Sequence, residues 1–94
     1  MFDVSRGESG SLFFTGRLDA SQADRARAVL DAISESCTID FAALDYISSA
    51  GLGALLATQK RLSDTGRTLT LVHLNKHIRE IFRIAGFDII FPIE

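Results

Sequence analysis

The sequence predicts an α/β fold in which a mixed, mostly parallel sheet of four to five strands packs against three to four helices. Short apolar runs that suit buried strands alternate along the chain with amphipathic segments of helical spacing. Alternating strands and helices imply parallel strands joined by right-handed crossovers. The first two apolar runs are separated only by "SRGESG", which suits a hairpin and makes the sheet mixed.

The composition indicates one compact domain over residues 1–94. With 94 residues, 47% of them hydrophobic, and a single proline, the chain can bury a core and contains nothing typical of a disordered linker. Its formal net charge of −2 has the wrong sign for following a phosphate backbone, so we expect no nucleic-acid partner. Because no large exposed apolar stripe is predicted, we also expect a monomer.

Two features of the sequence point to the cytoplasm. The single cysteine, Cys37, has no partner for a disulfide, as is usual in a reducing compartment. Residues 1–10 lack the long apolar stretch of a signal peptide, and no window approaches the about 20 apolar residues that span a bilayer. We therefore expect a cytoplasmic protein without membrane association.

The N-terminal part predicts a hairpin followed by a helix. The run "LFFT" (12–15) suits a buried strand that closes at Gly16, and "FDV" (2–4) suits an edge strand beside it. Over residues 20–35, apolar residues recur at helical spacing and charged residues fill the opposite face. The apolar set is Ala23, Ala26, Val29, Leu30 and Ile33.

The central part predicts a strand, a connection and a second helix. The run "CTIDF" (37–41) alternates as a central strand does, and "AALDYI" (42–47) connects it to a helix that begins near Ser48 and stops at Gly66. The expected buried stripe of this helix is Leu52, Leu55, Leu56 and Leu62, and the residues expected to face water are Thr58, Lys60, Arg61 and Asp64.

The C-terminal part predicts a further strand over "TLTLVHL" (68–74), a third helix capped by Asn75 and ended by Gly86, and a last short strand or packed segment over "FDIIFPI" (87–93). The expected stripe of the third helix is Ile78, Ile81, Phe82 and Ala85, and the aromatic residues expected in the core are Phe82, Phe87 and Phe91. Basic residues on the outer faces are interpreted as solvated, with an acidic partner as the alternative: Lys60, Arg61, Arg67, Arg79 and Arg83.

Known catalytic and cofactor motifs do not fit this chain. A hydrolase nucleophile elbow requires glycine two residues before the serine, where Tyr46 and Ile47 stand instead. His73 and His77 have the four-residue spacing of helical metal ligands but flank a strand-to-helix junction, with no carboxylate or cysteine cluster to complete a site. The lone "GLG" lacks the other residues of a nucleotide fingerprint. We therefore expect no catalytic residue, no metal and no cofactor.

The stretch "YISSAGLG" (46–53) is the most informative part of the chain. Ser48 is placed to cap the second helix, and Ser49 lies in its first turn, where free N–H groups and the helix dipole tolerate a phosphate. The serine pair is thus either an ordinary helix start or a phosphorylation target. Gly51 and Gly53 likewise indicate either tight packing on the sheet or a thin exposed surface for a docking protein.

The stretch from Ile39 to Ile93, together with "LFFTGRLDA" (12–20), resembles the STAS family, named for sulphate transporters and anti-sigma factor antagonists. The resemblance rests on an aspartate-bearing strand, a serine before Gly-Leu-Gly at the following helix, the "GRLD" turn and the "GFD" near the C-terminus. It covers nearly the whole chain and implies the STAS fold.

The resemblance implies a regulatory role without catalysis. Stand-alone family members bind a serine kinase that is also an anti-sigma factor and free a sigma factor; phosphorylation by that kinase ends binding, and a metal-dependent serine phosphatase reverses it. By position, the implied target is Ser49. The expected partner-binding residues are Asp19, Ala20, Ser48, Ala50, Gly51, Leu52 and Gly53.

The chain departs from the commonest form of the motif, Asp-Ser-Ser-Gly or Asp-Ser-Thr-Gly, at two positions. Ser48 stands in place of the aspartate, which removes a negative charge beside the target and adds a competing hydroxyl. Ala50 removes the hydroxyl that usually follows the target. Ser48 is thus the only competitor close to Ser49.

Two other functions stay open at this point. The first is an accessory subunit of a lipid-transporting ABC complex, because such subunits also resemble STAS domains and contact an ATPase through the same helix. The second, with less support, is a domain that binds a nucleotide or other small molecule at the strand-to-helix junctions.

Overall fold

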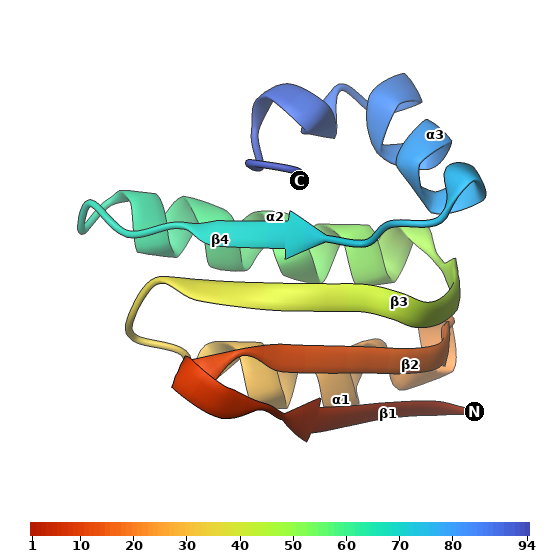
Figure 1. Ribbon diagram of the computed structural model, residues 1–94, viewed down its shortest axis with the longest axis horizontal. Helices are drawn as coiled ribbons and strands as arrows, with labels where there is room; N and C mark the ends of the chain where they lie inside the picture. The colour runs from red at the N-terminus through yellow and green to blue at the C-terminus, as the bar shows by residue number, and fades with distance from the viewer.

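The computed structural model describes the backbone of residues 1–94 and every side chain except that of Ser9. Four strands form one sheet in the order β1-β2-β3-β4 (Figure 1). β1 runs antiparallel to β2, whereas β2, β3 and β4 are parallel, so the prediction of a mixed, mostly parallel sheet is confirmed. The strands are β1 (Phe2–Arg6), β2 (Leu12–Leu18), β3 (Cys37–Ile47) and β4 (Leu69–Val72).

The three predicted α-helices are present, and α1 and α2 lie together behind the sheet in Figure 1, with α3 beyond the β4 edge. No helix in the described part of the chain is long and apolar enough to cross a membrane. The α-helices are α1 (Ala23–Asp31), α2 (Ser49–Ser63) and α3 (Lys76–Ile84), and short 3-10 helices form at η1 (Glu8–Gly10), η2 (Ala20–Gln22) and η3 (Phe87–Ile89).

A row of phenylalanine rings runs through the core from β1 to α3. Phe2 meets Phe14 edge to face at 5.3 Å between ring centroids, and Phe14 stacks on Phe41 at 5.8 Å. Phe41 meets Phe82 at 6.2 Å, and Phe82 meets Phe91 at 5.9 Å. These contacts tie the N-terminal strand to the C-terminal segment and confirm the core position expected for Phe82 and Phe91.

β3 is longer than the sequence predicts. Residues 42–47, expected as a connection, continue the strand to Ile47. The pairing with β2 shifts between Phe13 and Thr15 and again between Gly16 and Arg17, because β3 carries an extra residue at each place. These two bulges break the alternation of apolar residues from which a strand would be read.

The buried face of α2 differs from the predicted leucine stripe. Thr58, expected to face water, is buried and donates its hydroxyl hydrogen to the Ala54 carbonyl over 2.9 Å. Leu52 and Leu56, expected in the stripe, are only half-buried. Small residues allow the helix to approach the sheet closely, so the stripe follows them: it is Gly51, Ala54, Leu55, Thr58, Gln59 and Leu62.

Other differences lie at the ends of helices and strands. The helix expected over 20–35 begins as η2 and its α-helical part stops at Asp31. Ala85, expected in the α3 stripe, is exposed because it is the cap residue after the last helical turn. The strand expected over 68–74 is shorter, and His73 beyond it has a positive φ of 61°.

The C-terminal segment packs along the outer edge of β4. The Leu71 N–H donates to the Pro92 carbonyl and the Glu94 N–H donates to the Leu71 carbonyl, each over 2.9 Å. Beyond η3, the segment forms only an isolated bridge between Leu71 and Ile93. Of the two structures predicted for residues 87–93, a short strand or a packed segment, the tail forms the packed segment. It protects this edge of the sheet.

Candidate functional site

Two strand-to-helix junctions meet at one end of the sheet. Leu18, the last residue of β2, pairs with Ile47, the last residue of β3. The Ser48 N–H donates to the Leu18 carbonyl over 2.8 Å. Because of this bond, the turn that starts at Asp19 lies beside the start of α2.

The two serines at the start of α2 have different environments. Ser48 is the N-cap: its backbone is extended, and its hydroxyl oxygen accepts from the Gly51 N–H over 3.1 Å. Ser49 is the first helical residue and is exposed, and no described group forms a hydrogen bond with its hydroxyl. The structure confirms the predicted cap and leaves Ser49 as the accessible hydroxyl of the pair.

The two glycines of α2 also differ. A Cβ atom on Gly51 would lie 2.8 Å from Leu18 Cγ and 3.1 Å from Ile47 Cγ1, so this buried glycine permits tight packing on the sheet. The expectation that Gly51 belongs to an exposed surface is therefore wrong. Gly53 is half-buried, and a Cβ atom there would meet nothing within 4 Å. Of the two glycines, only Gly53 lies at the surface, where the absence of a side chain keeps the helix thin.

The outward face of α2 continues from Ser49 along the helix. Residues three and four positions apart share a face, which places Leu52 and Gly53 beside Ser49. Leu52 is half-buried and contacts the core with part of its side chain. Leu56, one turn further, is also half-buried, although its hydrophobicity predicts a place in the buried stripe.

The neighbouring junction carries a fixed negative charge. The Asp19 carboxylate accepts from the Ser21 hydroxyl over 2.6 Å and from the Ser21 N–H over 3.1 Å. The hydroxyl bond, together with the backbone bonds, holds the pKa of Asp19 below its usual range. Ala20 is exposed in η2, which contacts α2. Asp19 and Ala20 thus flank the start of α2, as expected from the sequence.

A cation–π pair precedes both junctions and has no obvious signal in the sequence. The Arg17 guanidinium lies 4.4 Å from the centre of the Tyr46 ring. Arg17 and Tyr46 are paired in the sheet, directly before the last pair of β2 and β3. The contact ties the two strands together immediately below the site.

Several basic side chains of the outer faces bond within the chain. Arg61 donates to the carbonyls of Ile33 and Leu30, over 2.8 and 3.0 Å, and so binds the carbonyl end of α1. Two other residues of this group form ion pairs within the chain, Arg67 with Glu35 and Arg83 with Glu80. These bonds engage three of the five basic side chains and favour the interpretation as a solvated face over that of a site for an acidic partner.

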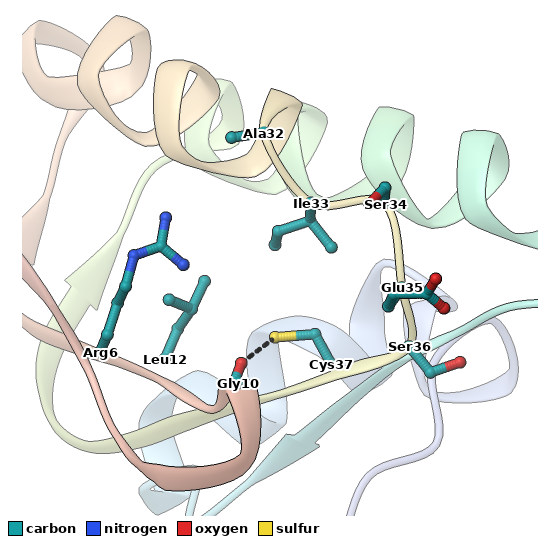
Figure 2. Close-up of a pocket in the computed structure, with 9 residues that line it drawn as sticks. All are labelled: Arg6, Gly10, Leu12, Ala32, Ile33, Ser34, Glu35, Ser36 and Cys37. Carbon is teal, nitrogen blue, oxygen red and sulfur yellow. Dashed lines mark hydrogen bonds between the residues drawn. The ribbon is translucent and has the colours of Figure 1, made fainter.

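A cavity of about 230 Å³ lies at the opposite end of the sheet, where β3 begins (Figure 2). Arg6 and Cys37 project toward it, and the Cys37 thiol donates to the Gly10 carbonyl over 3.1 Å. Burial raises the pKa of this thiol, and nearby Arg6 only partly offsets the effect, so the thiol is poorly suited to act as a nucleophile. The cavity is remote from the strand-to-helix junctions, where the sequence allows a site for a nucleotide or other small molecule.

One of the two histidines lies against a carboxylate. His73 Nδ1 lies 2.9 Å from an oxygen of Asp40. Across the described residues, no three His, Cys, Asp or Glu side chains are grouped in a way that could hold a metal ion.

Comparison with known proteins identifies relatives of the whole chain. The family model described as "Mlab, STAS domain" matches residues 1–92. BtrV of Bordetella bronchiseptica, named as a candidate anti-sigma factor antagonist, is 38% identical over 82 residues, which cover 83% of this chain and 71% of that protein.

Solved structures of anti-sigma factor antagonists share the fold. One from Mycobacterium paratuberculosis superposes with a TM-score of 0.83 at 21% identity, covering 99% of this chain and 83% of that one. Unphosphorylated SpoIIAA gives 0.71 at 17% identity, covering 100% and 87%. Phosphorylated SpoIIAA from Bacillus gives 0.71 at 18% identity, covering 100% and 91%. The fold, the family match over residues 1–92 and the relative in Bordetella lead to one conclusion: the chain belongs to the STAS domain family.

Proposed function

We propose that the protein is an anti-sigma factor antagonist in a partner-switching pathway. In its unmodified form it binds a serine kinase that is also an anti-sigma factor, and phosphorylation of Ser49 by that kinase ends the complex. The observation that carries the proposal is the division of roles at the start of α2, where Ser48 caps the helix and Ser49 is exposed. A metal-dependent serine phosphatase restores the binding form, and the pathway operates in the cytoplasm.

The start of α2 tolerates a phosphate without a change of fold. Phosphoserine carries about −1.5 to −2 charges, and the free N–H groups and positive dipole of a helix N-terminus stabilise such an anion. Because Ser48 keeps its cap bond to Gly51, modification of Ser49 alters the surface and leaves the helix in place.

Release follows from where this charge is added. Partner binding removes water from Ser49, Ala50, Leu52 and Gly53, so a doubly charged group enters a desolvated contact without a counter-charge. Asp19 on the neighbouring junction is ionised and adds repulsion. BtrV of Bordetella bronchiseptica, which is 38% identical to this chain, is named as a candidate anti-sigma factor antagonist, and this supports the proposed class of function. No catalytic step is assigned to the antagonist itself.

The proposal is tested with immobilised variants as bait for proteins from the source cells. Ser49→Ala is expected to retain an ATP-binding serine kinase, and Ser49→Asp is expected to lose most of it. Ser34→Asp adds the same charge on an exposed loop at the opposite end of the sheet and should bind like the unmodified chain.

Equal recovery of the kinase by Ser49→Ala and Ser49→Asp would contradict the switch. Recovery of an ABC ATPase by all three variants, with no serine kinase, would instead support the accessory-subunit function.

A further inference from the structure

The cavity in Figure 2 lies where the hairpin of β1 and β2 meets the segment that links α1 to β3. Two of its lining residues, Leu12 and Ile33, belong to the buried core and give it an apolar floor. Its volume of about 230 Å³ is below the about 300–1,000 Å³ of pockets for drug-sized ligands. The cavity therefore suits a molecule of a few heavy atoms with an apolar part.

Hydrogen bonds fix both sides of this cavity. On the hairpin side, the Cys37 thiol donates to the Gly10 carbonyl over 3.1 Å, as Figure 2 shows. On the side of the segment between α1 and β3, Arg61 donates to the Ile33 carbonyl over 2.8 Å. Because these bonds already hold the walls, little conformational entropy is lost when a ligand enters.

The charges around the cavity leave one cation without a partner. The Arg6 guanidinium projects toward the cavity and forms no hydrogen bond or ion pair with any described group. Glu35, the only carboxylate among the residues that line the cavity, accepts from Arg67 over 2.9 Å and points away from Arg6 in Figure 2. Burial raises the pKa of the Cys37 thiol, so the thiol stays neutral at neutral pH. Positive charge therefore prevails in the cavity.

The missing partner distinguishes Arg6 from most other arginines of the chain. The guanidinium groups of four arginines bond to oxygen atoms of the chain: Arg25, Arg61, Arg67 and Arg83. Arg27 also lacks a partner among the described groups, but it is exposed on α1 and does not line the cavity. Arg6 thus combines an unbonded guanidinium with an adjacent apolar floor, and both are needed to bind a carboxylate that carries an apolar chain.

We propose that this cavity binds a small organic carboxylate. The planar guanidinium of Arg6 donates to both carboxylate oxygens, and the short apolar chain of the ligand lies against Leu12 and Ile33. Inorganic phosphate also suits a guanidinium but leaves the apolar floor uncovered, so the carboxylate binds more tightly. The inference does not depend on the proposed function, because this site lies at the opposite end of the sheet from Ser49.

Titration of the ¹⁵N-labelled chain with hexanoate, followed by NMR, tests the proposal. The amide signals of Gly10, Ile33 and Cys37 should shift and saturate, with a Kd of about 1 mM for a ligand with so few atoms. Hexanamide has the same shape without the charge, and phosphate has the charge without the chain. Each should bind at least about tenfold more weakly. Hexanoate shifts that do not saturate, or equal binding of hexanoate and either control compound, would overturn the proposal.

Two variants with the same change of net charge test the role of Arg6. Arg6→Gln should weaken hexanoate binding by at least about tenfold. Arg27→Gln removes a charge from the exposed face of α1 and should bind hexanoate like the unmodified chain. The amide spectrum of each variant without ligand shows whether the fold is retained. Unchanged affinity in Arg6→Gln, or an equal loss in both variants, would contradict a carboxylate site at Arg6.

Discussion

The backbone N–H of Ser48 donates to the carbonyl of Leu18 over 2.8 Å, and this bond joins the two junctions that form the candidate site. It fixes the first turn of α2 beside the turn at Asp19. A phosphate added to Ser49 would therefore enter a surface whose shape is set by the sheet, and the proposed switch would require no rearrangement of the fold.

Substitution of the two serines should separate capping from signalling. Ser48→Ala removes the bond from the Gly51 N–H and is expected to lower the free energy of unfolding by about 1 kcal/mol. Ser49→Ala removes no described bond and should change it by less than about 0.5 kcal/mol. Urea unfolding of both variants measures the difference. If Ser49→Ala proved the more damaging change, Ser49 would have a structural role that the bonding does not explain.

The two glycines of α2 offer a matched pair. Gly51→Ala forces a Cβ atom against Leu18 and Ile47 and is expected to destabilise the fold by about 1–3 kcal/mol. Gly53→Ala meets open space and should stabilise the helix by up to about 1 kcal/mol. In the bait experiment, however, Gly53→Ala should weaken kinase recovery, because its methyl group stands on the docking face. Loss of stability in both variants would contradict this division.

Gln59 holds α2, β4 and the C-terminal segment together. Its side-chain oxygen accepts from the Leu69 N–H over 2.7 Å, and its nitrogen donates to Thr68 Oγ1 over 2.9 Å and to the Ile90 carbonyl over 3.1 Å. Gln59→Leu leaves the buried Leu69 N–H without an acceptor, which should cost about 1–3 kcal/mol. Gln59→Glu keeps the acceptor and should restore protection of the Leu69 amide in hydrogen exchange. Equal exchange in both variants would show that this bond is dispensable.

Asp19 should titrate below the ordinary aspartate value of about 3.9. A carboxyl group with a lowered folded-state pKa stabilises the fold above its unfolded pKa, and that contribution disappears as pH falls through the folded pKa. Ser21→Ala removes the hydroxyl donor, so it should raise the pKa of Asp19 toward the ordinary value. NMR titration of the Asp19 carboxyl carbon checks this. An unchanged pKa in Ser21→Ala would mean that the hydroxyl bond is not its main cause.

The order of strands and helices could be predicted from the sequence because helix caps and stops are local. Ser48 and Asn75 accept the predicted cap bonds, from the N–H groups of Gly51 and Ile78. The extent of β3 could not be predicted, because its two bulges shift the apolar residues out of alternation. Bulges depend on how two strands fit together, and one strand's sequence carries little trace of them.

The candidate site was predictable in position but not in detail. Ser49, Asp19 and Ala20 lie where the motif places them. Gly51 could not be distinguished from Gly53, because only the packing of α2 on Leu18 and Ile47 decides which glycine is buried. The same packing buries Thr58 and turns Leu56 partly outward, against the hydrophobicity of both residues.

The most direct test of the central claim is mass spectrometry of the protein purified from its own cells, before and after treatment with a serine phosphatase. The account predicts a single phosphate, removed by the phosphatase and located by fragmentation on Ser49. A phosphate located on Ser48, or none under any of several growth and stress conditions, would contradict the proposed switch.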